Sequence, residues 1–61
     1  MMINSIILEG RLEERDGQKV LVSDLVTVAL IGEVRGRSGD EIRVVGKLTQ
    51  EGLKVEHSEK R

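Results

Sequence analysis

The sequence predicts an all-β domain, a small five-stranded barrel with no substantial helix. Apolar residues recur with a period of two, which is typical of half-buried strands and not of helices. Turn-forming residues separate the alternating stretches. One motif also occurs three times: IILEGRL at 6–12, VALIGEV at 28–34 and IRVVGKL at 42–48 each place a glycine within an apolar alternation.

The first two strands are expected to form a hairpin. A first strand is expected at 3–12, with Ile6, Leu8 and Leu12 on the inward face and Glu9 and Arg11 pointing the other way. Asp16–Gly17 is the Asp-Gly pair favoured in tight hairpin turns. A second strand is therefore expected at 19–23.

The remaining strands follow from the same alternation. A third strand is expected at 25–34, and the glycine-rich loop RGRSGD at 35–40 follows it. A fourth strand at 41–48 and a fifth at 53–57 are separated by the turn that Gly52 closes. The inward residues of the third and fourth strands are Val28, Leu30, Val34, Ile42, Val44 and Leu48. β-branched residues dominate, as a pleated and half-buried surface favours.

The three motif glycines, Gly10, Gly32 and Gly46, fall on inward-facing positions. Glycine within a strand usually marks a bulge, a sharp bend or a close backbone approach. Strands must coil strongly to close a small barrel, and a residue without a Cβ allows this bend. A charged and then an apolar residue follow each glycine in phase, which favours strands that continue. The alternative is that each glycine simply ends its strand.

The length of 61 residues limits the chain to one domain, expected at 1–57 with a polar tail, SEKR, at 58–61. A core of this size supplies about 3–5 kcal/mol, so small domains usually need reinforcement. The chain has no cysteine and one histidine, which excludes disulfides and zinc clusters. Association with another copy remains, so we expect a homo-oligomer.

Some outward-facing positions are apolar, and exposed apolar surface usually marks an interface. The expected oligomer interface consists of Ile7, Ala29, Ile31 and Val45. The alternative is a thicker core, with the MMI segment at 1–3 or the tail folded over these side chains.

The 10 basic and 11 acidic residues nearly cancel. Net charge therefore provides no long-range attraction to nucleic acid or to an anionic membrane. The chain shows neither an apolar run of about 20 residues, as a membrane span requires, nor a secretory leader. A cytoplasmic location and no membrane partner are expected. Because Phe, Trp and Tyr are absent, the core must be aliphatic and no ring can stack on a base.

Catalysis has little support in this sequence. His57 has no cysteine to act with, and its only nearby acidic residues are Glu56 and Glu59. The acidic residues at the first turn, Glu13, Glu14 and Asp16, are expected to keep it solvated. No GK[ST] follows the glycines of the 35–40 loop, so it is no phosphate-binding loop. We expect no enzyme, no cofactor, no metal and no small-molecule substrate.

Four segments resemble the bacterial single-stranded DNA-binding protein family, a branch of the oligonucleotide-binding (OB) fold. NSIILEGRL at 4–12 resembles its opening strand, and LVTVALIGEV at 25–34 fits the strand before its helix. GDEIRVVGKL at 39–48 is the closest match and resembles the strand after that helix. LKVEHSE at 53–59 resembles the closing strand.

The resemblance implies an OB-like barrel, single-stranded DNA as a partner, and assembly through sheet faces and edges that include the first strand. The chain departs from the family in three ways. The long hairpin between the second and third strands is reduced to Ser23–Asp24, and residues 35–40 are too few for the helix. The base-stacking aromatic residues have no counterpart. Another small coiled barrel, such as an SH3-like one, is the alternative fold.

Basic residues are the remaining means of binding nucleic acid. Arg11, Arg43 and Lys47 should lie on the outer face, while a glycine-rich loop carries Arg35 and Arg37. The candidate set is Arg11, Arg15, Lys19, Arg35, Arg37, Arg43, Lys47 and Lys54. Lost stacking is worth about 1–3 kcal/mol per base, so binding should be weak and should fall steeply with salt.

Two other interpretations remain open for these basic residues. In the first, they are solubilising charges that pair with acidic residues across strands: Glu9, Glu33 and Glu41. In the second, the chain is a protein-interaction or assembly module that has lost nucleic-acid binding.

Overall fold

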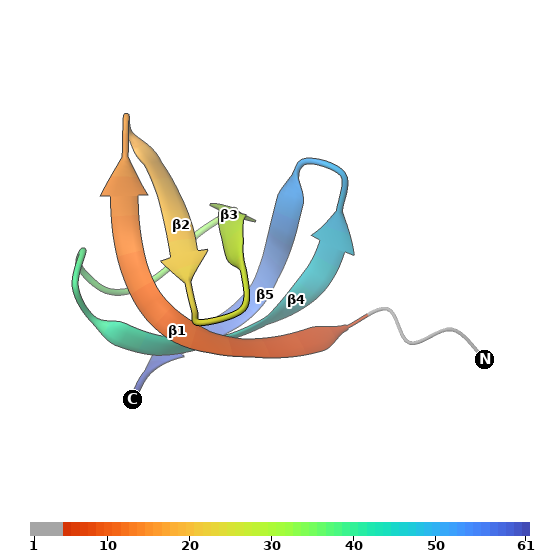
Figure 1. Ribbon diagram of the computed structural model, residues 1–61. Helices are drawn as coiled ribbons and strands as arrows, with labels where there is room; N and C mark the ends of the chain where they lie inside the picture. The colour runs from red at the N-terminus through yellow and green to blue at the C-terminus, as the bar shows by residue number, and fades with distance from the viewer. Residues whose placement is uncertain (1–4) are drawn as a thin grey trace.

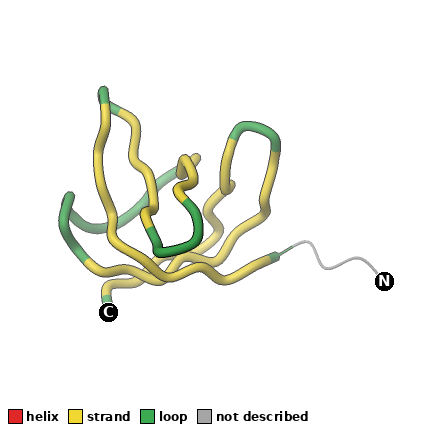
Figure 2. The backbone as a smooth tube through the Cα atoms, viewed as in Figure 1, coloured by secondary structure: helices red, strands yellow, loops and turns green. Residues whose placement is uncertain are grey.

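The computed structural model describes residues 5–61, and these residues form five strands and no helix (Figures 1 and 2). The strands are β1 (Ile6–Arg15), β2 (Gln18–Val22), β3 (Thr27–Ile31), β4 (Glu41–Thr49) and β5 (Gly52–Lys60). They close into a barrel in the order β1-β2-β3-β5-β4. Only the β3–β5 pairing is parallel. The predicted all-β, five-stranded barrel is confirmed.

Strand β1 belongs to both halves of the barrel. Its first part pairs with β4, and its part from Arg11 onward pairs with β2. Figure 1 shows the long curve that this double pairing imposes on β1. Gly10 lies where the strand changes partners, and a Cβ there would stand 2.5 Å from the carbonyl oxygen of Val22. The missing side chain therefore allows two backbones to approach closely, as predicted for this position.

Gly46 has the same role inside β4. A Cβ on it would collide with the carbonyl group of Lys54 on β5. The pairing also shifts at this point, because Val45 faces His57 whereas Gly46 faces Val55. Glu56 is thus an extra residue on β5, a β-bulge that increases the local bend.

The prediction that the third strand continues past Gly32 is wrong. Strand β3 ends at Ile31, and Gly32 follows it with a φ of 105°, a conformation that favours glycine. The strand is shorter than the predicted 25–34, yet Val34 still reaches the core. Two backbone hydrogen bonds with Leu12 tie down the far end of the following loop. The loop thus delivers Val34 to the barrel without strand pairing.

The core is aliphatic and follows the predicted inward phase with one clear exception. Its buried members are Leu12, Leu21, Leu30, Val34, Ile42, Val44 and Leu53. Leu48 was expected inside but is 63% exposed. The described pairing of β1 with β4 ends at Ile6 and Gly46, so Leu48 has a neighbouring strand only on its β5 side.

The predicted polar tail at 58–61 belongs largely to a strand. β5 continues to Lys60, and the backbone N–H of Arg61 donates to the carbonyl oxygen of Glu41 at 2.9 Å. Backbone pairing with β4 needs no apolar side chains, so SEKR extends the sheet despite its polarity. The start of the first predicted strand, at residues 3 and 4, lies outside the described residues, as does the MMI segment.

Candidate nucleic-acid interface

Arg43 lies in a row of charges that crosses three strands on the outer face. Its Nε donates to Glu9 Oε2 on β1 at 2.7 Å, and its Nη1 donates to Glu59 Oε1 on β5 at 3.4 Å. Arg61 adds a second cation 3.6 Å from Glu9. Such cross-strand pairs stabilise a sheet. Arg43 is thus neutralised by neighbours in its own sheet, which fits the interpretation of paired surface charges.

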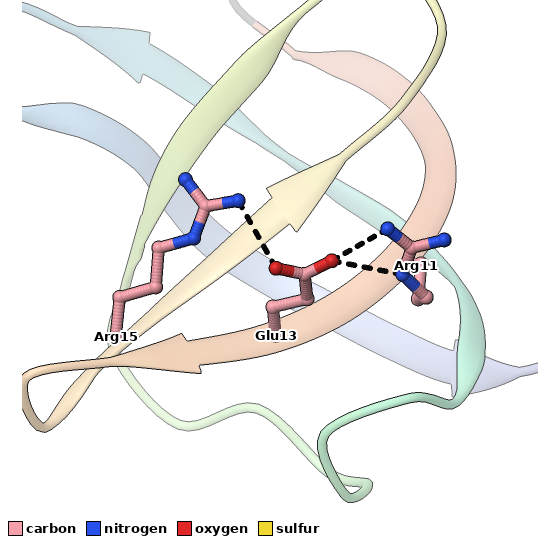
Figure 3. Close-up of polar contacts among 3 residues, drawn as sticks. All are labelled: Arg11, Glu13 and Arg15. Atoms are coloured by element: carbon pink, nitrogen blue, oxygen red, sulfur yellow. Dashed lines mark hydrogen bonds and ion pairs between the residues drawn. The ribbon is translucent and has the colours of Figure 1, made fainter.

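A second cluster runs along the outer face of β1 (Figure 3). Arg11, Glu13 and Arg15 are alternate residues of one strand, so their side chains point the same way. Arg11 donates to Glu13 Oε2 through Nε at 2.9 Å and Nη2 at 2.6 Å. Arg15 Nη2 donates to Glu13 Oε1 at 3.0 Å. One carboxylate therefore holds two of the predicted binding residues.

These hydrogen bonds shift the acidity of both glutamates. The Arg43 hydrogen bond lowers the pKa of Glu9, and the hydrogen bonds from Arg11 and then Arg15 lower the pKa of Glu13. A carboxyl whose pKa is lowered by folding stabilises the fold above its unfolded pKa. This contribution is present at neutral pH and is lost as the pH falls through the folded-state pKa values.

Two of the predicted lysines also have partners. Lys19 is half-buried, and its Nζ donates to the carbonyl oxygen of Val34 at 3.0 Å. Its contact ties β2 to the loop after β3. Lys47 Nζ lies 3.9 Å from Glu56 Oε2, a loose exposed pair. Lys19 therefore has a structural contact, and Lys47 is only weakly engaged.

Arg35, Arg37 and Lys54 form no ion pair with any residue in 5–61. Arg35 lines a surface hollow beside β5, and its backbone N–H donates to Ser58 Oγ at 3.2 Å. Arg37 lies between two glycines of positive φ, in a turn where its N–H donates to Asp40 Oδ2 at 2.9 Å. Both arginines are exposed on a loop, and Lys54 is exposed on β5.

The four predicted interface residues fall into two pairs. Ile7 and Val45 face each other across β1 and β4 on the outer face. Ala29 and Ile31 lie on β3, which neighbours neither of these strands in the barrel. The structure therefore brings the members of each pair together but not the four as one patch.

The sequence interpretation missed two apolar residues next to Ile7. Leu25 and Val26, expected in a strand, lie in the loop between β2 and β3, where Leu25 is 96% exposed. They line one hollow together with Ile7, which is 64% exposed. Ser23 shapes this loop, since its Oγ accepts from the Val26 N–H at 3.2 Å. The Ser23–Asp24 turn signal was visible in the sequence, but the side to which the loop turns was not.

Val20 was also missed, and its environment depends on pairing. It is buried but is not part of the core cluster. Its partners across the sheet are Glu13 on β1 and Ala29 on β3. Because partners point to the same side, Val20 lies on the outer face beside Glu13 of the arginine cluster. No signal within β2 alone distinguishes this environment from the core.

Within residues 5–61, no three His, Asp or Glu side chains are grouped so that they could hold a metal ion. The same part of the chain has no helix that could cross a membrane. No protein-family model, curated protein or solved structure matches this chain.

Proposed function

We propose that this barrel is of the OB kind and that it binds single-stranded nucleic acid weakly. The observation that carries the proposal is the strand order, in which β1 is shared by both halves and a parallel β3–β5 contact closes the ring. OB folds bind oligonucleotides on the face of strands 2 and 3 and on the loops β1–β2 and β4–β5. In Figure 1 the hairpins that carry these two loops project on either side of β3.

The chemistry of this face explains why the binding should be weak. Its outward residues on β2 and β3 include Val20, Ala29 and Ile31, which have no ring to stack on a base. Phosphate contacts then supply nearly all of the affinity, and such binding weakens as salt rises. The exposed cations without an ion pair in residues 5–61 are the proposed contacts, and they lie next to this face instead of within it. Lys54 on β5 is the cross-strand partner of Ile31, and Arg35 and Arg37 are on the loop that follows β3.

The test is fluorescence anisotropy of labelled oligo-dT at low and moderate salt. The double variant Arg35→Ala/Arg37→Ala should weaken binding about threefold to tenfold, because two exposed charge contacts are lost. The slope of log Kobs against log [salt] should become shallower by about 0.7 for each phosphate contact removed.

The matched control is Arg43→Ala, which removes an arginine that Glu9 and Glu59 already neutralise. Arg43→Ala should change the affinity for oligo-dT less than the double variant Arg35→Ala/Arg37→Ala does. Binding that stays tight at high salt, or an equal loss in both variants, would contradict the proposal.

A second candidate function is self-association, with a second copy of this chain as the partner. The observation that favours it is the hollow lined by Ile7, Leu25 and Val26, which leaves large apolar side chains in solvent. A domain with a core this small would gain stability from covering them.

Light scattering at tens of micromolar tests this candidate. The wild type should have the mass of a dimer or larger assembly, and Leu25→Lys should shift it to the monomer of 6.8 kDa. Leu25 is almost fully exposed, so the variant should fold normally. A monomer mass for the wild type would remove the candidate.

A further inference from the structure

The carboxylate of Glu13 occupies a position between two arginines that resembles a phosphate site. Arg11 donates twice to one carboxylate oxygen, and Arg15 donates to the other, over 2.6–3.0 Å. Figure 3 shows Glu13 between the two guanidinium groups. Guanidinium groups bind carboxylate and phosphate oxygens with the same planar geometry.

The exposure of this cluster allows an incoming anion to compete with Glu13 for the two arginines. About half of each arginine side chain is exposed, 52% for Arg11 and 56% for Arg15, whereas Glu13 is 24% exposed. Glu13 lies beside the buried Val20, its partner on β2. The guanidinium groups thus face solvent, while the glutamate that joins them is held closer to the barrel.

We propose that Arg11 and Arg15 form a binding site for a phosphate oxyanion, and that Glu13 occupies this site when no ligand is bound. A phosphate would replace the carboxylate, which would turn outward into solvent. Exposed ion pairs contribute little net stability, so this exchange is energetically accessible. Arg11 has one further acidic neighbour, Glu41, opposite it on β4.

This inference deepens the proposed function and rests on it for the oligonucleotide ligand. Glu13 would then weaken nucleic-acid binding directly, because two of the basic residues on the barrel surface are neutralised until it is displaced. The same chemistry could accept the phosphodiester of a strand or free phosphate, so both probes are needed.

Glu13→Gln removes the competing charge while keeping the shape of the side chain. We expect it to bind oligo-dT about threefold to tenfold more tightly than the wild type, because two arginines become available. For this variant the slope of log Kobs against log [salt] should become steeper by about 0.7 for each new phosphate contact.

Glu14→Gln is the matched control. It changes the net charge equally, one residue along β1 on the opposite phase, and Glu14 has no ion pair among residues 5–61. It should leave both the affinity and its salt dependence near wild-type values. Adding Arg11→Gln to Glu13→Gln should abolish the gain.

Nuclear magnetic resonance of the arginine Nε groups separates the two ligand sources. In Glu13→Gln, inorganic phosphate should shift the signals of Arg11 and Arg15 more than in the wild type. Shifts with phosphate but no oligo-dT binding by any variant would support the anion site and refute the nucleic-acid function. An equal gain in Glu14→Gln, or weaker binding of both probes by Glu13→Gln, would overturn the inference.

Discussion

Replacing Gly46 with alanine is expected to lower the free energy of unfolding by about 3 kcal/mol or more, which is most of the stability of this domain. The new Cβ would collide with the backbone carbonyl of Lys54, and strand pairing on both sides holds β4 at this point. Overpacking usually costs about 1–3 kcal/mol and can cost more where backbone must move. A domain of this size has only about 3–5 kcal/mol to lose. Urea unfolding followed by far-ultraviolet circular dichroism measures the effect, since the chain has no Trp or Tyr.

Gly39→Ala is the control for the Gly46 variant. Unlike Gly46, Gly39 has a positive φ, 101°, which favours glycine, but no atom lies within 4 Å of a Cβ placed on it. The expected cost is about 1 kcal/mol, from backbone strain alone. Equal unfolding midpoints for the two variants would contradict the explanation that Gly46 is needed because the Lys54 backbone leaves no room for a Cβ.

Leu53→Ala is expected to reduce the free energy of unfolding by about 2–5 kcal/mol. Leu53 is a fully buried member of the core cluster, near the start of β5, where it also pairs with Leu30 on β3. Removing its side chain leaves a cavity that a closed barrel cannot readily collapse. The unfolding midpoint in urea should fall sharply, and an added osmolyte restores a measurable transition if the variant is largely unfolded.

Leu48→Ala provides a control with the same chemistry. Leu48 is the cross-strand partner of Leu53, yet it is 63% exposed. Its truncation should change stability by no more than about 0.5 kcal/mol. A loss as large as that of Leu53→Ala would restore the original prediction that Leu48 faces the core.

The inward residues were the part of the fold most visible in the sequence. Ile42 and Val44 alternate with charged or outward residues, and this alternation predicts both the strand and its buried face. The prediction failed at Leu48 because burial also needs a neighbouring element to cover the side chain. Gly32 illustrates the same limit, since its motif resembles those of Gly10 and Gly46 but no strand continues through it.

The candidate binding residues were less predictable than the core. Their positions on outward faces follow from alternation, as for Arg11 and Arg43. Whether each cation is neutralised depends on which acid lies beside it. The two acids beside Arg43 are distant in the chain: Glu9 is 34 positions from Arg43, and Glu59 is 16 positions from it. Glu13 is only two residues from Arg11, but its contact with both arginines depends on the side-chain geometry along β1.

The chain alone specified an aliphatic all-β domain, its turns and most of its inward residues, because alternation and turn chemistry are local properties. Other features depend on contacts between distant segments. They are the strand order, the bulge opposite Gly46, the pairing of the SEKR segment with β4, and which cations within residues 5–61 have an acidic partner. Many pairings satisfy the same alternation, and only packing in three dimensions selects one of them.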